Sequence, residues 1–210
     1  MKNIYISICL IILSVSCYAQ KQIFESPKLK SEISKHKMVA IVPFNVSITY
    51  KKQPKNFSAE ANRDQEKTMS TSIQSSMYTF LLRKSKNYSV AFQDVDKTNI
   101  LLKKAGMYDK MDQYTNDELA KALGVDAIIG GKFLTEQTKS ESGAIASAIL
   151  FGGLGGKTGT GTLTMTLNNG TDGDLLWRFF KTMDDGITTS TDDLVEKMMR
   201  KVSRNFPYML

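Results

Sequence analysis

The sequence has 210 residues, 41% of them hydrophobic and 23% charged, a balance typical of a folded globular chain rather than a disordered or fibrous one. Its formal net charge is +7, and it holds only two cysteines and one histidine. That scarcity excludes much of the catalytic and metal chemistry that depends on thiol and imidazole groups. After residue 19 there is no apolar run near the ~18 residues that a membrane-spanning helix needs.

Residues 1–19, MKNIYISICLIILSVSCYA, have the pattern of a secretory signal peptide. A lysine and a long apolar stretch are followed by small side chains at Cys17 and Ala19, which are positions −3 and −1 of a cleavage site after Ala19. The alternative is lipidation at Cys17, which requires a leucine where this sequence has Ser14. We therefore predict export, to the periplasm or to the outer membrane, of a mature chain without cysteine.

Residues 20–36 show no strong period, and we expect them to form a basic N-terminal arm. Residues 20–55 contain eight lysines and two glutamates, whereas the rest of the mature chain is neutral. Two interpretations stay open: a solvated arm that aids solubility, or a contact with an anionic envelope surface. An exported protein meets little nucleic acid, so we expect no nucleic-acid partner.

The first half of the remaining chain alternates between strand and helix patterns. Apolar side chains at Met69, Ile73 and Met77 recur at helical spacing, after a possible N-cap at Ser58. Thr115 and Glu118 form a capping box. The predicted elements are a strand over 38–50, a helix over 58–86, a short strand over 88–92, helices over 96–105 and 117–123, and a buried strand over 125–134. Because Pro43 lacks a backbone donor, we expect an edge, a bulge or the exit of the first strand at that position.

The second half predicts a hairpin and a final helix. Residues 162–167 alternate strictly, with leucines and a methionine on one side and three threonines on the other. Turn residues lead to a return strand over 175–183, and a helix follows over 192–205. We therefore predict one α/β domain over residues 37–210. It has a mixed sheet of about five strands covered by helices, with a C-terminal β-hairpin followed by a helix.

Motifs that suggest chemistry fail on spacing or context. The glycine-rich run over 152–158 resembles a phosphate-binding loop, but Phe151 stands where that loop needs glycine, and a strand follows instead of a helix. His36 has no identifiable partner and is expected to be a solvated surface side chain. Glu60, Asp64 and Glu66 are expected to form a solvated helix face. We assign no catalytic, cofactor-binding or metal-binding residue, and predict that the protein is not an enzyme.

The segment GAIASAILFGGLGG, residues 143–156, is the least ordinary part of the sequence. One interpretation is a buried helix packed on the sheet. The other is an exposed apolar element that contacts a membrane or another subunit. On the second interpretation, the residues predicted to make partner or membrane contacts are Ile145, Ile149, Leu150 and Phe151, with Lys51, Lys52 and Lys55 as an electrostatic supplement.

Several of these segments resemble a known family. The strand MVAIVPF, the run LAKALGVDAIIGGKF and the hairpin TGTLTMTLNNGTDGDLLWRF are similar to the periplasmic α/β domain of the curli secretion channel family. That domain is related in fold to the TolB amino-terminal domain and to lipoprotein activators of peptidoglycan synthases. The chain also resembles secreted envelope proteins that end in a helix followed by Phe-Pro-Tyr, here Phe206 to Tyr208. The resemblance spans residues 38–208.

The resemblance implies a noncatalytic envelope module that works through protein contacts and often oligomerises. It does not extend to the two membrane-spanning hairpins of the channels. The first would need alternating apolar and polar side chains, which AIASAILF lacks, and the second would need two crossing strands, for which residues 184–191 are too few. We predict a cell-envelope binding or assembly component acting through protein–protein or membrane-surface contacts. Its expected partners are envelope proteins, a second copy of itself, or the outer-membrane surface. The alternatives are an outer-membrane pore or secretion-channel subunit and an envelope hydrolase of unrecognised type.

Overall fold

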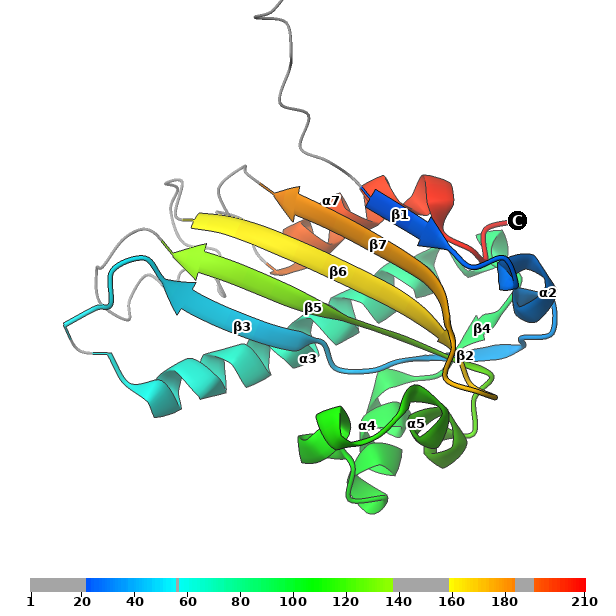
Figure 1. The fold of residues 1–210 in the computed structure, drawn as a ribbon, viewed down its shortest axis with the longest axis horizontal. Coiled ribbons are helices and arrows are strands. Elements are labelled where there is room, and N and C mark those ends of the chain that lie inside the picture. The colour runs from blue at the N-terminus through cyan, green and yellow to red at the C-terminus, as the bar shows by residue number, and fades with distance from the viewer. Residues whose placement is uncertain (1–21, 56, 138–158, 184–190) are drawn as a thin grey trace, which may run out of the picture.

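Seven strands form one mixed sheet in the computed structural model, which describes residues 22–55, 57–137, 159–183 and 191–210 (Figure 1). The strand order is β1-β7-β6-β5-β2-β4, and β3 pairs with β5 beyond the end of β2. The strands are β1 (Gln22–Glu25), β2 (Met38–Ile41), β3 (Asn45–Tyr50), β4 (Ala91–Phe92), β5 (Ala127–Gln137), β6 (Gly159–Asn169) and β7 (Leu175–Met183). The helices are α2 (Leu29–Ile33), α3 (Ala59–Arg83), η1 (Ser85–Asn87), α4 (Val95–Lys104), η2 (Tyr108–Gln113), α5 (Asn116–Leu123), α7 (Thr191–Val202) and η3 (Ser203–Asn205). This confirms the predicted mixed α/β fold.

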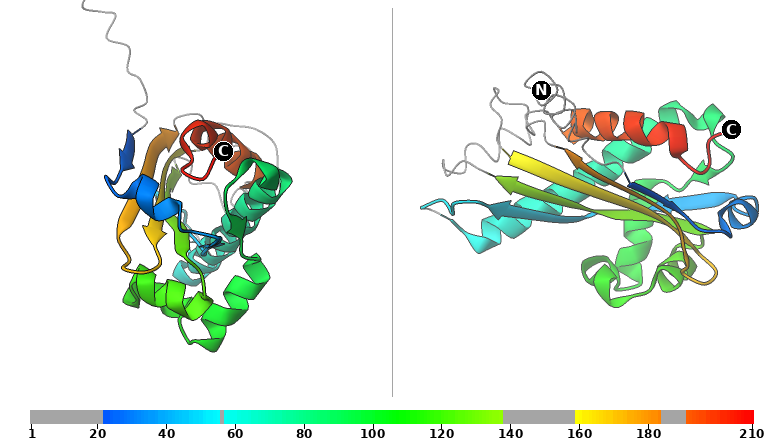
Figure 2. Two further views of the ribbon diagram at one scale, coloured as in Figure 1. Left: turned by 90° about the vertical axis from the view of Figure 1, so that its right-hand side faces the viewer. Right: turned by 45° about the horizontal axis from the view of Figure 1, so that its top comes forward.

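Helices lie on both faces of the sheet, but they cover the faces unequally. Helices α3 and α7 pack against one face, and Figure 2 shows both on the same side of the sheet. The main hydrophobic core lies between them and the strands, and it includes Ile41, Ile73, Ile129, Leu163 and Trp177. A second, smaller cluster on the other face joins α4 and α5 to β2 and to the start of β5. No described helix is both long enough and apolar enough to cross a membrane.

The predicted strand over residues 38–50 is divided into β2 and β3, and both run parallel to β5. β2 pairs with residues 127–129 of β5, and β3 pairs with residues 132–137. Pro43 lies at the division, where a residue without a backbone N–H cannot continue the ladder. The irregularity expected at Pro43 is a break between two strands, after which the chain resumes its pairing with β5.

The basic stretch before β2 is not a pendant arm, so this expectation was wrong. β1 pairs antiparallel with β7, and the ammonium of Lys28 lies 3.0 Å from the carboxylate of Asp174. Leu29 of α2 is buried in the main core. A four-residue strand is too short to show a period, and its partner lies more than 150 residues later in the sequence. β1 and the division of the 38–50 strand account for seven strands instead of five.

Local sequence signals place the remaining elements as predicted. The hydroxyl of Ser58 accepts a hydrogen bond from the Ala61 N–H at 3.2 Å and caps α3. The Thr115–Glu118 capping box begins α5, and Gly124 ends it with φ of 65°. On β6, Leu163, Met165 and Leu167 are buried, while the threonines between them are partly exposed. These signals involve residues no more than four positions apart.

Candidate functional site: an uncovered face of the sheet

One face of the sheet is largely uncovered by the helices in the described part of the chain. α4 and α5 pack on Ala40, Val42 and Ile128 at its β2 end, and α5 also lies beside β6. The rest of this face is turned away from α3 and α7, and Figure 1 looks directly onto it. The outward side chains, which we call the open face, are Phe24 on β1, Arg178, Phe180 and Thr182 on β7, Thr162, Thr164 and Thr166 on β6, Lys132, Leu134 and Glu136 on β5, and Ser47 and Thr49 on β3.

The open face mixes hydroxyl, apolar and cationic groups. The three β6 threonines form its centre, because β-branched side chains suit a pleated surface and their hydroxyls tolerate water. Leu134 is 48% exposed and Phe24 is 47% exposed, so both offer apolar area on this face. Such a surface is compatible with water but also offers apolar area to a partner.

Arg178 stands at the apolar end of the open face. Phe24 is its direct cross-strand neighbour on β1, and Thr166 is its neighbour on β6. A hollow of about 300 Å³ is lined by Gln22, Ile23, Phe24, Arg178 and Phe180. Within the described residues the Arg178 guanidinium makes no hydrogen bond or ion pair. It is therefore a cation without a counter-ion, beside two aromatic rings.

The β3 edge of the sheet is closed by side chains of α3. Glu66 Oε1 accepts the Ile48 N–H at 2.8 Å, and Asn62 Nδ2 donates to the Ile48 carbonyl at 3.3 Å. Burial, with a contribution from the negative charge of Glu66, raises the pKa of the nearby Tyr50 phenol. Glu66 was expected on a solvated helix face, which is wrong. It is half-buried because the edge strand needs an acceptor.

The end of the sheet near β4 is also occupied. Tyr88 forms a β-bridge with Met209, and the Ser89 N–H donates to the Tyr208 carbonyl at 2.9 Å. The Leu210 N–H donates to the Asn87 carbonyl at 3.0 Å. Residues 208–210 therefore lie along the chain that leads into β4. β1 is the remaining edge strand of the sheet.

The structure places three of the predicted contact residues, and the other four lie outside the described residues. Lys51, Lys52 and Lys55 are exposed in the connection from β3 to α3. Register puts Tyr50 beside Gln137, and Gln137 beside Gly159. The lysines therefore follow β3 at the same end of the sheet where β5 ends and β6 begins. Ile145, Ile149, Leu150 and Phe151 belong to the segment between those two strands, which the structure does not describe.

His36 is buried, so its assignment as a solvated surface residue was wrong. It is 7% exposed, and its Nδ1 lies 2.6 Å from the Tyr208 hydroxyl. Its Nε2 lies 3.1 Å from Asn169 Oδ1, while Asn169 Nδ2 donates to Asp172. This pattern assigns the proton to Nε2, so Nδ1 accepts from Tyr208. With both nitrogens engaged, the imidazole joins three distant segments instead of facing a substrate.

The Asp126 carboxylate supports the same junction. It accepts the N–H groups of Lys37 and Met38 at 2.7 and 2.9 Å, and so ties the start of β2 to the start of β5. Partial burial raises the pKa of Asp126, but these two donors outweigh burial and leave the pKa below its ordinary value. Sequence reasoning missed the junction because none of these contacts is local.

We expect the junction to make the fold sensitive to alkali. Burial, together with the negative charge of Asp126, raises the pKa of Tyr208 far above its ordinary value of 10.0. Above pH 10 the unfolded chain loses this proton and the folded chain keeps it, so the free energy of unfolding should fall by up to ~1.4 kcal/mol per pH unit for this group. Urea unfolding at pH 8 to 11 measures the slope. Tyr208→Phe should make the slope shallower, and an unchanged slope would contradict the assignment.

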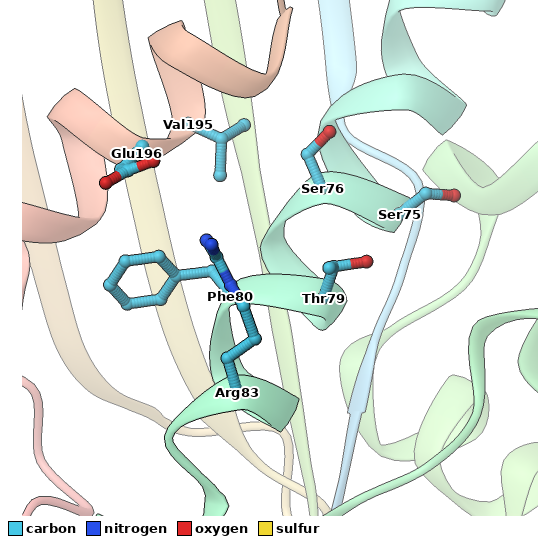
Figure 3. Close-up of a pocket in the computed structure, with 7 residues that line it drawn as sticks. All are labelled: Ser75, Ser76, Thr79, Phe80, Arg83, Val195 and Glu196. Carbon is cyan, nitrogen blue, oxygen red and sulfur yellow. The ribbon is translucent and has the colours of Figure 1, made fainter.

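A second hollow, of about 290 Å³, lies between α3 and α7 (Figure 3). The Arg83 guanidinium lies over the Phe80 ring, 5.7 Å from its centroid. Glu196 is already hydrogen bonded to Arg200 at 2.7 Å, which lowers the pKa of Glu196. In Figure 3 the hydroxyls of Ser75 and Thr79 point away from the Arg83 guanidinium. The polar groups do not converge, so we interpret the hollow as a surface groove between helices.

Comparison with known proteins gives fold-level similarity only. No protein-family model matches the sequence, and no curated protein matches it. Lipoprotein GNA1162 from Neisseria meningitidis is 13% identical, with a TM-score of 0.45 over 80% of this chain and 98% of that chain. A leucine-to-methionine variant of the PelC dodecamer from Paraburkholderia phytofirmans is 14% identical, with a TM-score of 0.39 over 87% of this chain and 94% of that chain. The C-terminal domain of LpoB from Escherichia coli is 8% identical, with a TM-score of 0.33 over 75% and 93%.

These low values carry no functional argument. The resemblance to the curli secretion channels stays a prediction.

Proposed function

We propose that this protein is a noncatalytic binding or assembly component of the bacterial cell envelope, and that it acts through protein–protein contacts made by the open face. One observation carries the proposal: a broad part of the sheet is uncovered by the described helices and combines exposed apolar groups with unpaired cations. Aromatic residues and arginine are enriched in protein interfaces, where rings supply contact area and guanidinium supplies directed hydrogen bonds.

The chemistry of the site favours binding over catalysis. Arg178, Lys132 and the threonine hydroxyls can donate hydrogen bonds, but His36, the single histidine of the sequence, is held in a buried junction by Tyr208 and Asn169. It is therefore unable to act as a general base at the open face. The polar groups of the open face are spread over several strands, as in a docking surface.

The end of the sheet that carries Lys51, Lys52 and Lys55 supplies a second proposed contact. These lysines are exposed and lie at the same end as the limits of the 138–158 segment. We include Ile145, Ile149, Leu150 and Phe151 of that segment in this contact on the strength of their apolar sequence. Cationic groups beside an apolar element suit an anionic membrane surface or an acidic protein.

Substitution at the centre of the open face tests the proposal. Thr164→Arg places a large charged side chain on the face without entering the core, so the free energy of unfolding should change by less than about 1 kcal/mol. We expect it to abolish recovery of the partner from envelope extracts by an affinity-tagged chain.

Ser85→Arg is the matched control, because Ser85 is exposed in η1, away from the open face. It should leave recovery unchanged. Equal recovery by the unsubstituted chain, Thr164→Arg and Ser85→Arg would show that the open face is not the docking surface.

A further inference from the structure

The backbone of β1 presents hydrogen-bonding groups on its outer side. The Ser26 N–H donates to the Leu176 carbonyl at 2.8 Å, which places Ser26 in a hydrogen-bonded pair with β7. In an antiparallel ladder, residues whose backbone groups face the partner strand alternate with residues whose groups face away. The backbone N–H and C=O groups of Phe24 therefore face β7, like those of Ser26. The backbone N–H and C=O groups of Ile23 and Glu25 point outward, away from the sheet. In the described part of the chain nothing receives them.

The open β1 edge contrasts with the other two edges of the same sheet. Glu66 and Asn62 occupy the outer backbone groups of Ile48 on β3, and residues 208–210 lie along the chain leading into β4. An unpaired edge strand is a template for pairing with another chain, and proteins usually block it. Among the described residues, contacts are therefore present at the β3 edge and before β4, whereas β1 is open beside the most apolar part of the open face.

The side chains beside this edge select for a negative charge. Arg178 has no counter-ion in the part of the chain that the structure describes, and Phe24 stands between it and the edge. Glu25 lies on the opposite face, because its cross-strand partner Trp177 is in the main core. Glu136 lies on β5, which is three strands away from β1 in the sheet. Within the described ranges, the open face near β1 therefore has a positive charge, an aromatic ring and a hollow of about 300 Å³ without a carboxylate in its lining.

We propose that β1 receives an extended segment of a partner protein as an added edge strand, and that this segment carries a glutamate or aspartate on the Phe24 side that pairs with Arg178. The inference rests on the proposed function and specifies how the partner binds. The outward groups of Ile23 and Glu25 supply backbone hydrogen bonds, and the Arg178 guanidinium supplies specificity for the carboxylate. A second copy of this chain fits less well, because pairing β1 with itself would add a second Arg178 but no acid on the Phe24 side of the added strand.

Synthetic peptides on the full chain provide the test. The probe is a blocked seven-residue peptide of alternating threonine and valine with a central glutamate, and its binding is followed by chemical shifts of the Ile23 and Glu25 amides. A peptide with lysine in place of glutamate should bind at least about tenfold more weakly. A peptide N-methylated on its hydrogen-bonding edge should not bind, because it cannot pair with the outward groups of β1. This comparison uses the unsubstituted protein, so folding of a variant is not at issue.

Two variants separate the backbone from the charge. Glu25→Pro removes one outward N–H and keeps the β1–β7 hydrogen bonds, since proline is tolerated where an edge N–H faces solvent. It should abolish peptide binding, while Glu25→Gln, the control for the lost charge, should not. Protection of the Phe24 amide from exchange checks that β1 stays paired. Arg178→Gln should remove the preference for glutamate over lysine.

The outcomes distinguish this inference from the proposed function. If Thr164→Arg abolishes partner recovery but the N-methylated peptide binds as well as its parent, strand addition is overturned and the proposed function stands. If light scattering shows a dimer that Glu25→Pro dissociates, the occupant is a second copy and the acidic partner is overturned. Glutamate and lysine peptides of equal affinity would overturn the role of Arg178.

Discussion

Replacing Gly131 with alanine should destabilise the fold by about 3 kcal/mol. Gly131 lies on β5 opposite Met165, where the Phe44 ring packs directly over the backbone. A Cβ atom at this position would overlap the Thr164 carbonyl oxygen and lie 2.7 Å from Cε1 of Phe44. The ring could turn aside, but the carbonyl belongs to the β5–β6 ladder and cannot move without loss of pairing. Urea unfolding followed by the fluorescence of Trp177 measures the change.

Gly130→Ala is the matched control for this prediction, because it adds the same methyl group one residue earlier on the same strand. Its Cβ would meet only Cγ2 of Val42, at 3.2 Å, and a side-chain methyl can give way. We expect a cost of about 1 kcal/mol or less. Similar losses at the two positions would show that the close approach at Gly131 does not determine the effect.

Replacing His36 with alanine should also cost about 3 kcal/mol. The change removes a buried ring and leaves the Tyr208 hydroxyl and Asn169 Oδ1 without their partner. Each unsatisfied buried group costs about 1–3 kcal/mol, and the space left by the ring adds to the loss. Hydrogen exchange should show the effect spreading to α2 and to residues 206–210, because the imidazole joins them.

A double-mutant cycle with Tyr208→Phe isolates the His36–Tyr208 hydrogen bond. Tyr208→Phe alone should cost about 1–2 kcal/mol, because it leaves Nδ1 of His36 without a donor. The double variant should cost less than the sum of the single variants, since the partner is already gone. A negligible loss in His36→Ala, as expected for a solvated histidine, would contradict the buried junction.

Sequence reasoning predicted the elements whose signals are local. The Ser58 cap, the Thr115–Glu118 box and the alternation of residues 162–167 each involve side chains a few positions apart, and the structure confirms all three. The same alternation correctly placed three threonines on the outer side of β6. It could not show that this side is uncovered, because coverage depends on where α4 and α5 pack.

The missed features depend on residues that are distant in sequence. His36 contacts residues 133 and 172 positions away, so no pattern around it reveals a partner. β1 has four residues, fewer than a periodicity needs, and is ordered by β7. Glu66 resembles any exposed helical carboxylate until the edge of β3 is placed beside it. The open β1 edge follows from the order of the strands, which the sequence alone did not provide.

The packing of residues 206–208 in the core has a consequence for biosynthesis. Phe206 and Tyr208 pack in the main core, and the centroids of the Phe206 and Trp177 rings are 6.2 Å apart. A nascent chain that has not yet released these residues from the ribosome lacks part of its hydrophobic core and cannot complete it. Completion of the fold must therefore follow release of residue 208 from the ribosome tunnel.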